Sequence, residues 1–146
     1  MPLSHLNLTA IQTAVATRLP KTYEPLTLTF YGLGTRQKGD VITFANDGFV
    51  DLCVNARDGR VYAKDQSNKI PDRFVNTGFE QFIAFFNAYV EHAKKIWNAE
   101  QAGISKDYWA LVRAMRPALE AIDKDALGDI NKYWEPAVEQ IEEENQ

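Results

Sequence analysis

The hydrophobic positions of this chain follow a helical period at its start, a strand period through its middle and a helical period again in its second half. The first helical stretch places apolar side chains at Leu8, Ile11, Val15 and Leu19. This spacing predicts a helix that Asn7 or Thr9 would cap and that Pro20 would follow. A helix, a strand-rich middle and a helical remainder together predict an α+β domain rather than alternating βαβ units.

The middle of the chain contains the runs that we expect to form strands, at 26–31, 41–45, 49–54, 61–64 and 74–75. Residues 26–31 alternate between apolar and polar side chains. In a half-buried strand, such alternation turns one set of side chains toward the core. We therefore expect Leu26, Leu28 and Phe30 to face the interior.

The run at 49–54 is apolar except for Asp51, which favours a central strand. The Asp58-Gly59 pair that follows it predicts a tight hairpin turn, because glycine readily adopts the positive φ that such turns need. Residues 32–40 contain three glycines and are expected to form a loop.

The segment after the strands predicts the main core helix. Thr77 and Glu80 have the spacing of a capping box, in which the Thr hydroxyl accepts a hydrogen bond from the Glu80 N–H and the carboxylate reaches back. An apolar stripe then follows at Phe79, Phe82, Ile83, Phe86, Val90, Ala93 and Trp97. A helix with such a stripe buries it against the rest of the core.

A further helix is expected to open at Ser105, with Trp109, Val112 and Met115 turned inward. Pro117 should kink or restart this helix, because a proline inside a helix removes a hydrogen bond and clashes with the preceding turn.

The last helix should begin near Asp123 or Asp125, with a bend or restart near Trp134 because Pro136 follows it. Its apolar side is expected at Leu127, Ile130, Trp134, Val138 and Ile141.

The length of 146 residues suits one domain, which we expect to span 1–146. The single cysteine, Cys53, excludes an intrachain disulfide. The N-terminal residues lack the basic and apolar regions of a signal peptide, and no apolar run approaches the ~20 residues of a membrane helix. These features favour a soluble cytoplasmic protein with no membrane partner.

The net charge of −4 is unevenly distributed, because residues 119–146 carry nine acidic and two basic side chains. This acidic end argues against direct binding of nucleic acid, since phosphate neutralisation dominates such binding. It suits a basic protein partner through electrostatic steering. Simple solvation of a helical surface by carboxylates is an equally ordinary explanation of the charge run.

No residue pattern predicts catalysis. His5 and His92 lack a further His or Cys at metal-ligand spacing, so we expect no metal site. Cys53 falls within an apolar strand pattern and is interpreted as a buried structural residue. The glycines of 32–39 lack the Gly-Lys-Ser/Thr ending of a phosphate loop. We therefore expect no cofactor and no enzymatic activity.

A few polar and aromatic residues remain as candidates for partner contact. Tyr31 and Tyr62 lie outside the apolar stripes, and exposed tyrosines are efficient interface anchors. Asp51 is a carboxylate within an apolar strand, which either has a hydrogen-bonding partner or lies on the exposed face. Turn chemistry already explains Asp47, which precedes a glycine.

Three motifs of the chain resemble the SUKH superfamily of bacterial immunity proteins. They are Asp47-Gly48-Phe49-Val50-Asp51-Leu52-Cys53-Val54, Asp58-Gly59-Arg60-Val61-Tyr62 and Phe74-Val75-Asn76-Thr77-Gly78-Phe79-Glu80-Gln81-Phe82. The Leu19-Pro20 pair after the first helix and the acidic C-terminal end are also similar to members of this superfamily. Gly78 departs from the pattern, because many members have a serine or a larger residue there.

The resemblance implies a curved, mostly antiparallel sheet with an N-terminal helix, a long core helix after the strands and C-terminal helices. It also implies a protein that binds and neutralises a co-encoded polymorphic toxin, often a nuclease or a nucleic-acid deaminase, by occluding its active site. An intracellular scaffold or regulatory module of the same fold is the alternative. The candidate contact residues are Tyr31, Asp47, Asp51, Tyr62 and Asp65 on the sheet and its loops, with Glu135, Glu139, Glu142 and Glu143 second.

Overall fold

The computed structural model describes residues 7–103 and 106–144. The helices are α1 (Leu8–Arg18), α2 (Phe79–Gln101), α3 (Lys106–Asp123) and α4 (Trp134–Glu144). The strands are β1 (Thr22–Tyr23), β2 (Leu28–Phe30), β3 (Arg36–Lys38), β4 (Val41–Asn46), β5 (Val50–Asn55), β6 (Val61–Asp65) and β7 (Arg73–Asn76). Short 3₁₀ turns occur at η2 (Glu24–Leu26), η3 (Gly32–Gly34) and η4 (Lys124–Ala126). This order confirms the predicted α+β class.

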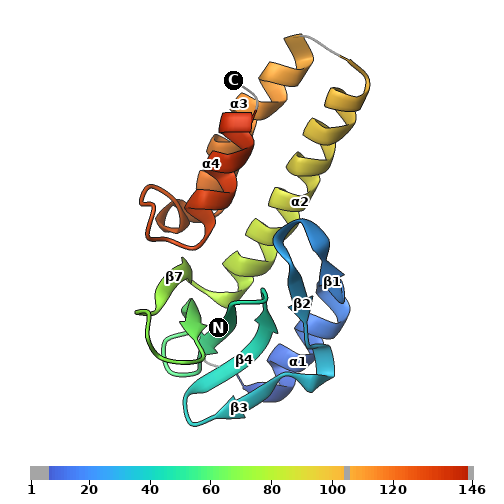
Figure 1. Ribbon diagram of the computed structural model, residues 1–146. Coiled ribbons are helices and arrows are strands. Elements are labelled where there is room, and N and C mark those ends of the chain that lie inside the picture. The colour runs from blue at the N-terminus through green and yellow to red at the C-terminus, as the bar shows by residue number, and fades with distance from the viewer. Residues whose placement is uncertain (1–6, 104–105, 145–146) are drawn as a thin grey trace.

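The seven strands form one antiparallel sheet in the order β1-β2-β4-β5-β6-β7, with β3 paired to β4. The register shifts between Thr43 and Ala45 in β4, and again between Val61 and Tyr62 in β6. Such bulges bend a sheet and increase its twist. Figure 1 shows the strands gathered at one end of the molecule, with α2 and the C-terminal helices extending away from them.

The first helix forms as predicted, and Asn7 is its cap. The Asn7 Oδ1 atom accepts a hydrogen bond from the Ala10 N–H at 2.9 Å. Ile11 and Val15 are buried in the core. An ion pair of 2.9 Å between Arg18 and Glu80 links the end of α1 to the start of α2.

The strand predicted at 26–31 is shorter than expected. Residues 24–26 form η2 instead, and Thr27 has a left-handed φ of 57° that reverses the chain before β2 begins. Leu26 therefore leaves the strand pattern and packs only partly buried against the core. Leu28 and Phe30 face the core as predicted. The short strands β1 and β3 were not predicted, because two or three polar residues carry no alternation signal.

The strand predicted at 49–54 is central, as expected, but it begins one residue later. Val50 opens β5, and Phe49 lies in the preceding turn with 84% of its surface exposed. The prediction that Phe49 belongs to this strand is therefore wrong, although the residue is hydrophobic.

The core helix α2 begins where predicted, but its cap differs. Gly78 occupies the cap position and supplies no side-chain hydrogen bond. The Thr77 hydroxyl donates to Asp123 Oδ1 at 2.7 Å, and Glu80 pairs with Arg18, so the predicted capping box does not form.

The buried stripe of α2 contains the predicted Phe79, Phe82, Ile83 and Phe86, and also Phe85, Tyr89 and Ile96. Trp97 was predicted to be buried but is 60% exposed. Helices pack on α2 beyond the sheet, so its core-facing side widens and rotates along its length.

The helix α3 runs unbroken through Pro117, so the predicted restart there does not occur. Pro117 is exposed on the surface of this helix. Val112 and Met115 are buried as predicted, but Tyr108 is buried in place of Trp109. Ser105, the predicted start of this helix, lies outside the described residues.

The last helix begins at Trp134, so the predicted start near Asp123 or Asp125 is wrong: only the short turn η4 forms there. The predicted bend or restart near Trp134 is confirmed by the start of α4. Pro136 lies in the first turn of α4, where its missing N–H has no partner in the helix. Leu127, Trp134 and Val138 are buried, whereas Ile130 lies in the preceding loop and is 57% exposed. Among the described helices, none is long and apolar enough to cross a membrane.

Candidate partner-binding surfaces

One face of the sheet carries a row of side chains that does not belong to the core of the molecule. Ile42, Leu52 and Val61 turn toward the α1–α2 side and are fully buried. Successive side chains along a strand point to opposite sides of the sheet. The residues that alternate with these buried ones therefore point to the other side, which we call the outer face. The strand register aligns five of these neighbours across the sheet, in the order Arg36, Thr43, Cys53, Tyr62 and Phe74.

The sheet brings three of the predicted contact residues, Tyr31, Asp51 and Tyr62, together on this outer face. The Arg36 guanidinium lies 5.9 Å from the centre of the Tyr31 ring. Burial raises the pKa of Tyr31, and the nearby negative charge of Asp51 raises it further. Burial also raises the pKa of Tyr62 to about 12, so both phenols remain neutral at physiological pH.

Cys53 lies fully buried between these tyrosines on the central strand. Its sulfur is 3.6 Å from the Thr43 hydroxyl oxygen. Burial raises the pKa of the Cys53 thiol to about 11. A thiol that stays protonated and inaccessible is a poor nucleophile. The geometry therefore supports the structural interpretation of this cysteine.

The carboxylates at the end of this face have local hydrogen-bonding partners. Asp51 Oδ1 accepts hydrogen bonds of 3.0 Å from the side-chain amides of both Asn46 and Gln66. Asp51 lies opposite Lys64 on the neighbouring strand. Asp51 thus lies on the polar side of the strand, hydrogen-bonded to its neighbours.

Asp65 organises the loop between β6 and β7. Its Oδ2 atom accepts hydrogen bonds from the Ser67 hydroxyl and from the backbone N–H groups of Lys69 and Ile70. The hydrogen bond from Ser67 is the main reason that the pKa of Asp65 is lowered. Asp65 is therefore a loop-forming residue whose contact with a partner stays a prediction.

The predicted acidic contacts on α4 divide into two kinds. Glu135 is only 5% exposed and pairs with both Nη atoms of Arg116, at 2.8 and 2.9 Å. Glu142 also pairs with Arg116, through Nε and Nη2. These two carboxylates join α4 to α3, and the bonds from Arg116 lower the pKa of Glu135 to about 2.

Glu139 and Glu143 leave α4 with an excess of negative charge. The pKa of Glu139 is raised, first by its interaction with Glu135 and also by the negative charge of Glu143. Arg116 pairs with Glu135 and Glu142, so Glu139 and Glu143 add negative charge beyond these ion pairs. An acidic surface of this kind attracts basic partners over long range.

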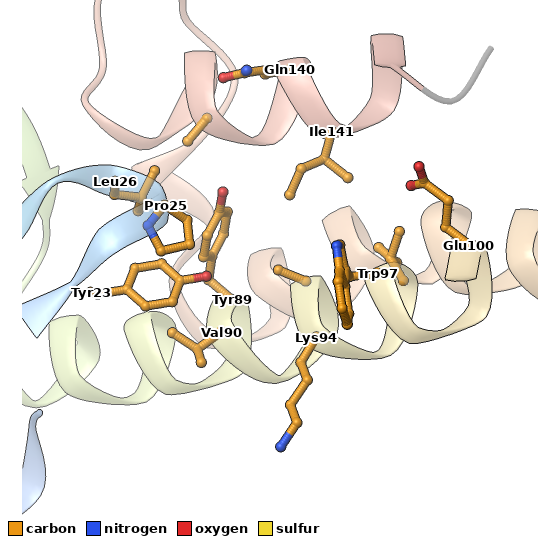
Figure 2. A pocket seen from close by; sticks show the side chains of 13 residues that line it. Tyr23, Pro25, Leu26, Tyr89, Val90, Lys94, Trp97, Glu100, Gln140 and Ile141 are labelled. Atoms are coloured by element: carbon orange, nitrogen blue, oxygen red, sulfur yellow. The ribbon is translucent and has the colours of Figure 1, made fainter. Parts of the chain in front are cut away.

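A second candidate surface is an apolar groove of about 530 Å³ between α2 and α4. Figure 2 shows Trp97 standing on α2 opposite Ile141 of α4, with Tyr23, Pro25 and Leu26 closing one end. Glu100 lies at the other end, and Lys94 points away from the groove. The helical spacing of Trp97 predicts a buried position, so this groove was not predicted from the sequence.

Among residues 7–103 and 106–144, no group of three or more His, Cys, Asp or Glu side chains is arranged to hold a metal ion. His92 Nδ1 is buried without a hydrogen-bonding partner, and within the described part of the chain His92 belongs to no such group. The described surfaces can contact a partner through their shape, their charge and their apolar side chains.

Comparisons with known proteins agree with this geometry. A model of the SUKH-4 immunity protein family matches residues 17–140. No curated protein and no solved structure gives a significant match to this chain. The family match extends from the end of α1 into α4 and therefore includes the sheet, the core helix and the C-terminal helices. The chain thus belongs to the SUKH-4 immunity protein family, as its resemblance to the SUKH superfamily implied.

Proposed function

We propose that this protein neutralises a co-encoded polymorphic toxin in the cytoplasm by covering the active site of that toxin. The toxin is expected to be a basic protein, either a nuclease or a nucleic-acid deaminase. Membership of the SUKH-4 immunity protein family is the observation that carries this proposal. The excess negative charge on α4 and the tyrosines on the outer face are the features that would recognise such a partner.

The outer face is the surface we assign to the toxin. Tyr31 and Tyr62 offer broad rings with few rotatable bonds, so ordering them in an interface loses little entropy. Phenols are neutral at physiological pH and burial raises the pKa of both further, so each hydroxyl can donate and accept a hydrogen bond. The carboxylates of α4 would act before contact, because they steer a basic protein without needing to touch it.

The test is a co-expression experiment with the toxin domain encoded beside the gene for this protein. Wild-type protein should restore growth and should form a stable complex with a catalytically inactivated form of the toxin. A Tyr31→Ala/Tyr62→Ala variant should bind more weakly, whereas Trp109→Ala on α3, outside both candidate surfaces, is the aromatic control and should bind like wild type. Failure of the wild-type protein to bind or protect would contradict the proposal.

The mode of neutralisation needs a separate measurement. A labelled single-stranded oligonucleotide bound to the inactivated toxin should be displaced when this protein is added. A ternary complex of toxin, oligonucleotide and immunity protein would show that the active site stays open. Neutralisation would then work by another route, even if growth is restored.

A further inference from the structure

Phe49 is the most exposed large apolar side chain in the described part of the molecule. It lies at the tip of the β4–β5 turn with 84% of its surface accessible to solvent. Burying a phenylalanine side chain removes a large apolar area from water and so stabilises a fold. In this fold the Phe49 ring stays in solvent, although Leu52 on the strand that follows is fully buried.

The backbone beneath Phe49 is fixed by the side chains of the two residues that open the turn. Asp47 Oδ1 accepts hydrogen bonds from the Phe49 N–H at 2.9 Å and from the Val50 N–H at 2.8 Å. Asn46 Oδ1 accepts a third, from the Gly48 N–H at 2.6 Å. Gly48 has a φ of 95°, which glycine adopts without strain. The aromatic ring is thus presented from a pre-organised turn.

The turn is also braced from the C-terminal half of the chain. The Tyr133 hydroxyl donates to Asp47 Oδ2 at 3.0 Å, and burial raises the pKa of this phenol, which keeps it a donor. Arg73 in turn lies over the Tyr133 ring and donates to the backbone carbonyl of Asn131. The loop that carries Ile130, itself exposed, is therefore tied to the turn that carries Phe49.

The same turn is continuous with the outer face of the sheet. The Asn46 side chain accepts from the turn through Oδ1 and donates through Nδ2 to Asp51 Oδ1. A single amide therefore connects the backbone below Phe49 to the carboxylate of the outer face. A partner that covers Asp51 would therefore lie close to the turn that carries Phe49.

We propose that Phe49 is the anchor residue of the toxin interface. The ring enters an apolar pocket on the toxin whose rim carries a cationic group facing Asp51. Interfaces take most of their binding energy from a few buried aromatic and arginine residues, and pre-organisation lowers the entropy lost on binding. This inference depends on the proposed function and adds the partner feature that the surface would recognise.

The decisive comparison is between Phe49→Ala and Leu33→Ala, measured by calorimetry with the inactivated toxin domain encoded beside this gene. Leu33 is 72% exposed and lies on η3 beside α1, so it matches Phe49 in character but not in position. Both variants should unfold at the wild-type urea concentration, because neither side chain is buried. Phe49→Ala should weaken binding by about 30-fold or more, mainly through faster dissociation, whereas Leu33→Ala should change it by less than about twofold.

Two further variants test the chemistry of the pocket. Phe49→Tyr should retain most of the affinity, because the ring is preserved. Asp51→Asn keeps an oxygen acceptor for Asn46 and Gln66, but it removes the charge, so it should weaken binding and reduce the dependence of affinity on salt. An unchanged salt dependence would contradict the cationic rim.

Binding by Phe49→Ala within twofold of wild type would overturn the anchor assignment, as would an equal loss with Leu33→Ala. Either result, with a wild-type protein that still protects, leaves the proposed function intact. A wild-type protein that neither binds nor protects would overturn the proposed function together with the anchor.

Discussion

The indole Nε1 of Trp134 donates a hydrogen bond to Asn76 Oδ1 at 2.9 Å, although the two residues are 58 positions apart. Both are completely buried. Asn76 in turn donates from Nδ2 to Asp123 Oδ2, also at 2.9 Å. This chain of contacts joins the end of β7 to the end of α3 and the start of α4. Because each polar group has a partner, the C-terminal helices have one defined position against the sheet.

Removing the Asp123 carboxylate should strongly destabilise the protein. This side chain accepts hydrogen bonds from Asn76 Nδ2, the Thr77 N–H and the Thr77 hydroxyl. Asp123→Ala leaves three donors without their acceptor, among them the fully buried amide of Asn76, so we expect it to lower the free energy of unfolding by about 2–5 kcal/mol.

Asp123→Asn should have a smaller effect, because its oxygen can replace Oδ2 while its NH₂ group donates to the Thr77 hydroxyl. Urea denaturation of both variants measures the difference, with exposed Asp125→Ala as the control. Equal stabilities for Asp123→Ala and wild type would show that the contact contributes nothing.

Acid should weaken the junction between α3 and α4. The bonds from Arg116 lower the pKa of Glu135 to about 2, from its ordinary value of 4.5. A carboxyl group with a lowered pKa binds its proton less tightly in the folded state than in the unfolded state. Its contribution is therefore complete above about pH 4.5 and is lost as the pH falls from there toward 2.

The comparison that isolates this contribution uses Glu135→Gln. Wild type should exceed the variant in free energy of unfolding by about 1–3 kcal/mol at pH 7, and the gap should narrow at pH 3. Glu142 still pairs with Arg116 in the variant, so the fold should persist. A gap that stays constant between these two pH values would contradict the assignment.

Pro117 should lower the stability of α3 even though the helix passes through it. An alanine there restores an N–H donor and removes the clash with the preceding turn, so Pro117→Ala should raise the free energy of unfolding by about 1–2 kcal/mol. Pro136→Ala is the matched control, because Pro136 lies in the first turn of α4, where no donor is needed. A larger gain at Pro136 than at Pro117 would show that this explanation is wrong. Thermal unfolding monitored by circular dichroism is a suitable measurement.

The sequence by itself determined the elements whose signal is local. The spacing of Ile11 and Val15 predicted α1, and the aromatic stripe that begins at Phe79 predicted α2. The glycine-containing turns predicted the points at which the strands reverse direction. The motifs of the strand region predicted the family. Periodicity and turn chemistry depend only on residues that are close in sequence, so they can be recognised without knowing the fold.

The tertiary structure decided which apolar side chains are buried and which carboxylates are accessible. Three residues, Phe49, Trp97 and Glu135, show why burial and accessibility depend on the whole fold. Burial depends on which distant segment covers a position, so hydrophobicity alone misplaced Phe49 and Trp97. Accessibility of Glu135 depends on Arg116, which lies on another helix. Local pattern specifies an element, whereas its exposed surface is specified only when the remaining elements pack around it.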